Sequence, residues 1–456
     1  MAAIPDPEKE SKSETPNIAN EDQLGVQNVY GDETHRRLKG RHIQLIGIGG
    51  TIGTVLFVQI GKGLMQGGPG SLFIAFSFWC LIVLTITMCI AEMVSYTPIS
   101  SPFVRFAGTY VDEALGFASG WNFFIFEAAL VPFEVTACHF ILQFWTDAIP
   151  VGATIAVIIV LYALINLMAI QYFGETEFWA AIGKVILIVG LIFFTFIVMV
   201  GGNPQKDAFG FTYWKSPGAF AELYYDGALG KFVGFLACLI QAAFSIAGPD
   251  YVAMAAGEAE NPRKILPRAF KTPRRFWKIC TRTGVPIYCV LVVLLIALLS
   301  FLQLSNSSAV VLSWFVSLVT ASQLINFSVI CLTYLCFYRA TKVQGFDRST
   351  LPYRAWFMPY AAYVGLVATF IMVFVGGYTV FLPGMWDVPS FLFSYTSVGL
   401  FPVFYVGWKI AHKTKIIKPS EIDLRHNLAP IEEYERNYVS KPPANWFEKV
   451  LHLLFG

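Results

Sequence analysis

Long apolar stretches dominate this sequence and constrain its fold more than any other feature. About ten of them have the roughly 17–25 residues that a helix needs to cross a bilayer. They are residues 43–61, 70–94, 116–145, 152–171, 178–200, 232–256, 285–303, 309–338, 358–382 and 388–408. Because lipid offers the backbone no hydrogen-bond partners, such stretches must be helical. The sequence therefore predicts an all-α polytopic membrane protein.

Composition excludes several other classes. The chain is 56% hydrophobic and only 14% charged, whereas about a quarter of a soluble domain is charged. A disordered chain, a nucleic-acid-binding domain and an ordinary cytosolic enzyme are therefore ruled out. No paired cysteine spacing indicates a disulfide framework or metal site, and no catalytic cluster appears. We expect a non-enzyme without metal or cofactor, whose partners include the lipid bilayer but no nucleic acid.

Basic residues in the short loops predict the orientation. A run of four basic residues precedes the first apolar stretch, and loops 257–284 and 339–356 are also rich in Arg and Lys. Segment 201–231 carries only three lysines. Because basic loops stay on the cytoplasmic side, we predict that both termini are cytoplasmic and that 201–231 is outside.

The same pattern divides the chain into three regions. Residues 1–41 are polar and are predicted to form a disordered cytoplasmic tail. Residues 42–412 form the transmembrane domain, and residues 413–456 form a second cytoplasmic tail.

Several ionisable residues stand inside the apolar stretches, where they usually face a cavity or a partner. The functional interpretation is strongest for Lys184 and Glu134. Snorkelling competes with function near span ends, and His139 is expected to be a core histidine with satisfied hydrogen bonds. The full set is Glu92, Glu127, Glu134, His139, Lys184 and Asp250.

Two of the spans look interrupted. The first carries four glycines between Gly47 and Gly53, which weaken a helix. The sixth contains Pro249, which lacks a backbone donor. Broken helices at corresponding places in two halves indicate a transporter's central site. The alternatives are close helix packing through Gly49 and Gly53 and a simple proline kink.

Ordered motifs along residues 36–435 resemble the fungal amino-acid permeases of the amino acid–polyamine–organocation superfamily. They include Gly49-Gly50-Thr51-Ile52-Gly53-Thr54, Gly67-Gly68-Pro69, Pro132-Phe133-Glu134, Gly183-Lys184-Val185, Phe244-Ser245-Ile246-Ala247-Gly248 and Gln344-Gly345-Phe346. The resemblance implies a five-helix inverted-repeat transporter fold and proton-coupled amino-acid uptake, most simply at the plasma membrane.

The resemblance also implies where the site lies. The substrate carboxylate would meet backbone amides around Gly49, Gly50, Thr51, Gly53 and Thr54, and its ammonium would meet carbonyls around Phe244, Ser245, Ala247 and Gly248. Lys184 and Glu134 would couple transport to protons. Burial disfavours the charged form of a lysine, which suits a group that exchanges a proton.

One departure from the family pattern is large. The family has twelve helices, whereas about ten are predicted here, and the missing pair would fall near residues 272–281. We therefore expect this form to transport poorly. Two alternatives remain open: a receptor-like member that binds an amino acid without moving it, and a defective product without activity.

Overall fold

The computed structural model describes residues 53–99, 102–146, 148–167, 170–246, 253 and 287–425, with residues 428, 432, 433 and 436. Every regular element in these ranges is helical, which confirms the predicted fold class. The long helices are α2 (Thr54–Tyr96), α4 (Glu113–Leu142), α6 (Ile170–Met199), α11 (Ser308–Val343) and α13 (Val388–His412). The shorter ones are α3 (Pro102–Tyr110), α5 (Val151–Leu167), α7 (Gly227–Ser245), α10 (Ile287–Ala297) and α12 (Tyr360–Val375). The brief turns are η1 (Trp214–Gly218), η3 (Leu298–Leu304), η4 (Arg348–Thr350) and η5 (Tyr378–Phe381).

Each predicted span overlaps one of these helices. Six stretches of the described chain are long and apolar enough to cross a membrane: Leu56–Tyr96, Glu113–Leu142, Ile182–Met199, Gly227–Ser245, Ser308–Val343 and Val388–His412. Shorter apolar helices cover Val151–Asn166, Leu291–Leu304 and Tyr360–Val375. The long apolar stretches of the sequence therefore locate the helices well.

A break in α2 separates the first two predicted spans. Gly68 has a φ of 79° and a ψ of 171°, which ends one helical segment before Pro69 begins the next. A Cβ atom on Gly68 would lie 2.8 Å from the Ala219 carbonyl oxygen, so only glycine fits. The Gly70 N–H donates to that same oxygen at 2.7 Å. The bend is thereby fixed against the chain that leads into α7.

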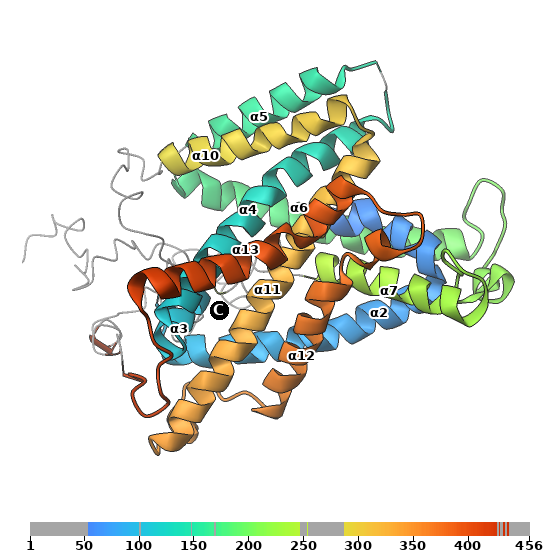
Figure 1. The fold of residues 1–456 in the computed structure, drawn as a ribbon. Helices are drawn as coiled ribbons and strands as arrows, with labels where there is room; N and C mark the ends of the chain where they lie inside the picture. Colours follow the sequence, from blue (N-terminus) through green and yellow to red (C-terminus); the bar gives the residue numbers. More distant parts are fainter. Residues whose placement is uncertain are drawn as a thin grey trace, which may run out of the picture.

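Helices α4 and α11 pack along each other at the centre of the molecule, and α12 and α13 pack on α11. Helices α5 and α10 lie side by side at one edge (Figure 1). Helix α6 is the outlier, because none of its apolar segment Ile182–Met199 is buried inside the protein. The surface of this segment is therefore available to lipid or to another helix.

Buried polar side chains join the central helices. The Asn122 amide on α4 donates to the Ser322 carbonyl oxygen and to Oδ1 of Asn326 on α11, both at 2.8 Å. The Ser322 hydroxyl shares a 2.7 Å hydrogen bond with that of Ser397 on α13. Because unpaired polar groups are costly in an apolar interior, these bonds fix how the three helices face one another.

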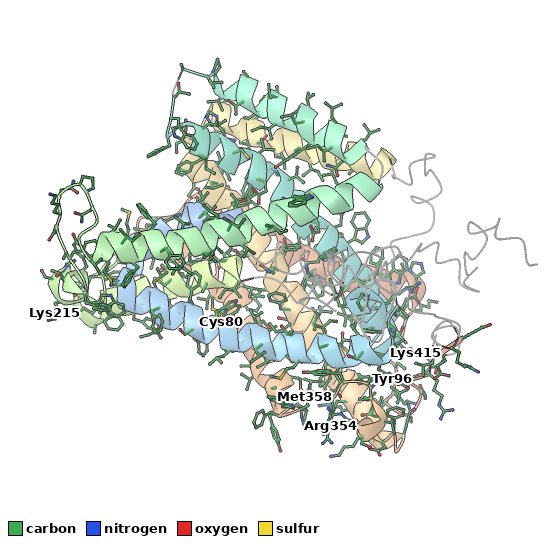
Figure 2. All side chains as sticks on the ribbon, turned by 180° about the vertical axis from the view of Figure 1, so that it is seen from behind. Cys80, Tyr96, Lys215, Arg354, Met358 and Lys415 are labelled. Atoms are coloured by element: carbon green, nitrogen blue, oxygen red, sulfur yellow. The ribbon has the colours of Figure 1, made fainter. Side chains whose placement is uncertain are left out.

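The two predicted sides of the membrane lie at opposite ends of the molecule. Lys215 stands at one end, whereas Tyr96, Arg354, Met358 and Lys415 gather at the other (Figure 2). We call the second end, which carries Arg354 and Lys415, the basic end. It contains the loop that the sequence predicts to be cytoplasmic.

Candidate functional site

The first part of the candidate site is the start of α2. Gly53 is extended, with φ −84° and ψ 164°, and the helix begins at Thr54. Gly53 has no side chain to cap the first turn, and that turn contains no acidic residue. The free N–H groups of a helix start favour an anion. The predicted Gly49, Gly50 and Thr51 lie outside the described residues.

The second part is the end of α7. This helix ends at Ser245, well inside the predicted span 232–256, and Ile246 is non-helical with φ −102° and ψ 89°. Ala253 is helical again. A helix leaves its last carbonyl groups without intrahelical donors, so the end of α7 presents acceptors. Ala247 and Gly248 lie outside the described residues, as does Asp250.

Glu134 connects the start of α2 to two other helices. Its carboxylate accepts a hydrogen bond from the Thr54 hydroxyl and interacts electrostatically with Lys184 on α6. All three residues are partly buried. The structure therefore brings together Thr54, Glu134 and Lys184, which come from three separate parts of the sequence.

An aromatic contact holds the end of α7 against the same turn of α4. The rings of Phe133 and Phe244 meet edge to face, with centroids 5.3 Å apart and planes at 90°. Phe244 is only 4% exposed. On the next turn, the Gln241 amide donates to the Ser245 hydroxyl at 3.4 Å. The helix start, the carboxylate–lysine pair and the helix end thus form one region around the middle of α4.

The sequence left two roles open for Glu92, a functional one and snorkelling to the membrane surface, and the structure gives it a third. Its side chain is fully buried and accepts hydrogen bonds from Nε and Nη2 of Arg348 at 2.6–2.8 Å. The backbone N–H of Ala355 donates to the same carboxylate at 2.9 Å. Glu92 therefore neither snorkels nor faces the candidate site; it anchors the loop between α11 and α12.

His139 is buried as expected, but the expectation of satisfied hydrogen bonds is wrong. It is 2% exposed, and neither ring nitrogen has a hydrogen-bond partner in the part of the chain that the structure describes. One turn earlier, the Thr136 hydroxyl accepts a hydrogen bond from the Gln303 amide at 3.1 Å. The neighbouring polar groups therefore pair with each other and leave the imidazole out.

Asp112 was missed by sequence reasoning because it lies just outside a predicted span. Its side chain caps α4 by accepting from the Ala114 N–H at 3.2 Å, and it pairs with Lys409 near the end of α13. Burial acts to raise the pKa of Asp112, but the hydrogen bonds from Lys409 and from the Ala114 N–H outweigh it and lower the pKa. The carboxylate is therefore held in its charged form.

The sequence is similar to known proteins along most of its length. The family model described as amino acid permease matches residues 42–273 and 271–420. The general amino acid permease AGP2 of Saccharomyces cerevisiae is 40% identical, over 89% of this chain and 85% of the relative. A proline-specific permease of Emericella nidulans is 31% identical, over 92% and 94% of the two chains. The dicarboxylic amino acid permease of S. cerevisiae is 30% identical, over 91% and 84%.

The alignments also contain an internal length difference. The alignment with the general permease spans 506 positions, which exceeds the 456 residues of the whole chain. That relative therefore has residues without a counterpart here. The family model matches in two pieces that meet at residues 271–273.

Proposed function

This chain belongs to the amino acid permease family, so its function class is amino-acid transport, and we propose that it couples uptake of an amino acid to protons. The membrane would be the plasma membrane, with both termini in the cytoplasm. The observation that carries the proposal is the interaction of Glu134 with Thr54, through a hydrogen bond, and with Lys184, through its charge.

The substrate carboxylate would bind at the first turn of α2. Gly53 is extended and leaves that turn uncapped, which supports this placement. Gly49, Gly50 and Thr51 would complete the cradle. Backbone N–H groups at a helix start carry partial positive charge and suit a carboxylate.

The substrate ammonium would bind at the end of α7. The helix ends at Ser245, so its last carbonyl oxygens are available there. Ala247 and Gly248 would extend the same strip of backbone. Phe244 would cover the bound substrate from α7, in a position that its packing on Phe133 supports.

Proton coupling would follow from competition at the start of α2. Ionised Glu134 puts a negative charge beside Thr54, where the substrate carboxylate would bind. Protonating Glu134 removes that charge, so substrate and proton would load together. When both leave, the Lys184 ammonium neutralises the carboxylate again. The electrostatic interaction between Glu134 and Lys184 supports this cycle.

The substrate side chain is not specified by these groups, because they meet only the carboxylate and ammonium shared by all amino acids. The names of the relatives also differ in the substrate range that they state, since one is a general permease and another is proline-specific. We therefore propose an α-amino acid as the substrate class.

Proteoliposomes test the proposal. The purified chain would be reconstituted and given radiolabelled amino acids under an imposed proton gradient, acidic outside. We expect accumulation that a protonophore abolishes. Saturable uptake that ignores the gradient would contradict coupling. Saturable binding without any uptake would favour a receptor-like protein instead.

A further inference from the structure

The segment after α13 returns across the basic end of the molecule. We call residues 413–425 the C-terminal strap. It begins at Lys413, whose φ of 50° turns the chain away from the helix. The strap contains no regular helix, and Lys415 lies with Tyr96 and Arg354 at the basic end (Figure 2). Nothing in the proposed substrate site uses this segment.

The strap first contacts the junction between α3 and α4. The Ile417 N–H donates to the Val111 carbonyl oxygen at 2.9 Å. The next residue, Asp112, pairs with the Lys409 ammonium on α13. Tyr405 donates its hydroxyl to the same carboxylate at 3.3 Å. The start of α4 is thereby tied to the end of α13 and to the beginning of the strap.

The strap next contacts the end of α11. The side-chain amide of Gln344 donates to the Pro419 carbonyl oxygen at 2.9 Å and to the Ile422 carbonyl oxygen at 2.7 Å. Gly345, with a φ of 65°, follows directly. The Gln344-Gly345-Phe346 motif is thus explained by the strap and not by the substrate site.

Two apolar side chains complete the docking. Ile422 and Leu424 are 3% and 4% exposed and belong to the same buried cluster as Tyr96 and Phe337. Most other strap residues are exposed, including Ile416 at 63%. The attachment is therefore local and small, which is typical of segments that open without global unfolding.

We propose that the C-terminal strap is a releasable lock on the basic end. When docked, it links the junction before α4, at Val111, to the end of α11 at Gln344. Helix α4 carries Glu134, so parting these helix ends would open the proposed site toward this side. The opening role rests on the proposed transport function, whereas docking and release do not.

Hydrogen exchange on the full-length detergent-solubilised chain tests the lock. Gln344→Glu removes both donors and places a carboxylate against two carbonyl oxygens. The matched control is Gln205→Glu, which adds the same charge on an exposed loop. We expect peptides covering 413–425 to exchange at least about tenfold faster in Gln344→Glu, because the hydrogen bonds that protect the strap are lost. Peptides from α4 and α11 should keep the wild-type rate, and Gln205→Glu should match wild type throughout.

Two exchange results would overturn the lock. Unchanged exchange of the strap in Gln344→Glu would mean that Gln344 does not hold it. Faster exchange across all helices would mean general destabilisation. Tyr405→Phe is the milder second variant, because it removes only the hydroxyl that donates to Asp112 and accepts from Lys409 beside the α3–α4 junction. It should speed exchange of the first strap residues alone, and unchanged exchange there would mean that the α3–α4 junction does not hold the strap.

Uptake of a mixture of the standard amino acids separates the lock from the transport proposal. Releasing the strap should favour the state open at the basic end, so Gln344→Glu should raise KM for external substrate about threefold over Gln205→Glu. Uptake with equal KM in both variants, despite faster strap exchange, would overturn the opening role. If no variant takes up amino acids, the transport proposal fails, and exchange still decides whether the strap is releasable.

Discussion

The buried carboxylate of Glu92 is clamped by the guanidinium of Arg348, a residue 256 positions later in the chain. The guanidinium of Arg348 also lies over the ring of Tyr338, with 4.8 Å between the guanidinium carbon and the ring centroid. A fully buried charge depends on its partner, because removing one member leaves the other uncompensated.

We therefore expect Arg348→Met to destabilise the protein by about 3–5 kcal/mol, the usual cost of stranding a buried charge. The measurement is thermal unfolding in detergent. The control is Lys418→Met, since Lys418 pairs with Glu421 at 3.3 Å but both side chains are mostly exposed. That change should stay within about 0.5 kcal/mol. Equal stability of the two variants would contradict a structural role for the Glu92 pair.

Lys184→Ala and Glu134→Gln should each remove the dependence of uptake on external pH. Each variant eliminates one member of the proposed exchange pair. Lys184→Arg should not restore it, because arginine stays protonated. Uptake at acidic pH should fall about tenfold, which corresponds to a free-energy change of about 1.4 kcal/mol. The control is Lys231→Ala, which removes a lysine from an exposed ion pair with Glu222. Normal pH dependence of uptake in Lys184→Ala would mean that Lys184 has only a structural role.

Phe244→Leu should weaken substrate binding while leaving the protein folded. Leucine removes the ring that we propose to cover the substrate, so KM should rise about threefold to tenfold, or about 0.6–1.4 kcal/mol. Phe232→Leu serves as the control, because it lies on the same helix but is 56% exposed. If both variants keep the wild-type KM, Phe244 does not bound the site.

Lys215→Cys and Lys415→Cys should react with an impermeant maleimide from opposite sides of the membrane. The two residues stand at opposite ends of the molecule (Figure 2), and the basic loops predict that the Lys415 end is cytoplasmic. Labelling of intact cells should modify Lys215→Cys alone. Modification of Lys415→Cys from outside would reverse the topology.

Inserting the corresponding segment of the S. cerevisiae general permease after Lys271 should raise transport. No residue of the apolar segment Ile182–Met199 of α6 is fully buried in the described structure, and an inserted segment could cover it. We expect faster uptake and more protein at the cell surface than the 456-residue chain gives. A scrambled insert of equal length is the control, and equal uptake by all three would show that the shorter chain is sufficient.

Local patterns in the sequence predicted the helices but not their long-range pairing. Apolar runs of membrane length located the helices, and the glycine and proline interruptions anticipated the start of α2 at Thr54 and the end of α7 at Ser245. Glu92 was misjudged because nothing near it in sequence identifies Arg348 as its partner. Whether the ring nitrogens of His139 have hydrogen-bond partners could not be predicted from local sequence either, because it depends on which polar groups the neighbouring helices present.

The Asp112–Lys409 pair has a consequence for how the chain is made. The two residues are 297 positions apart, and synthesis proceeds from the N-terminus. Asp112 therefore leaves the ribosome long before its cation exists, and α4 enters the membrane with an unpaired carboxylate at its N-cap. A chain that stops before α13 therefore lacks the lysine that pairs with this buried carboxylate.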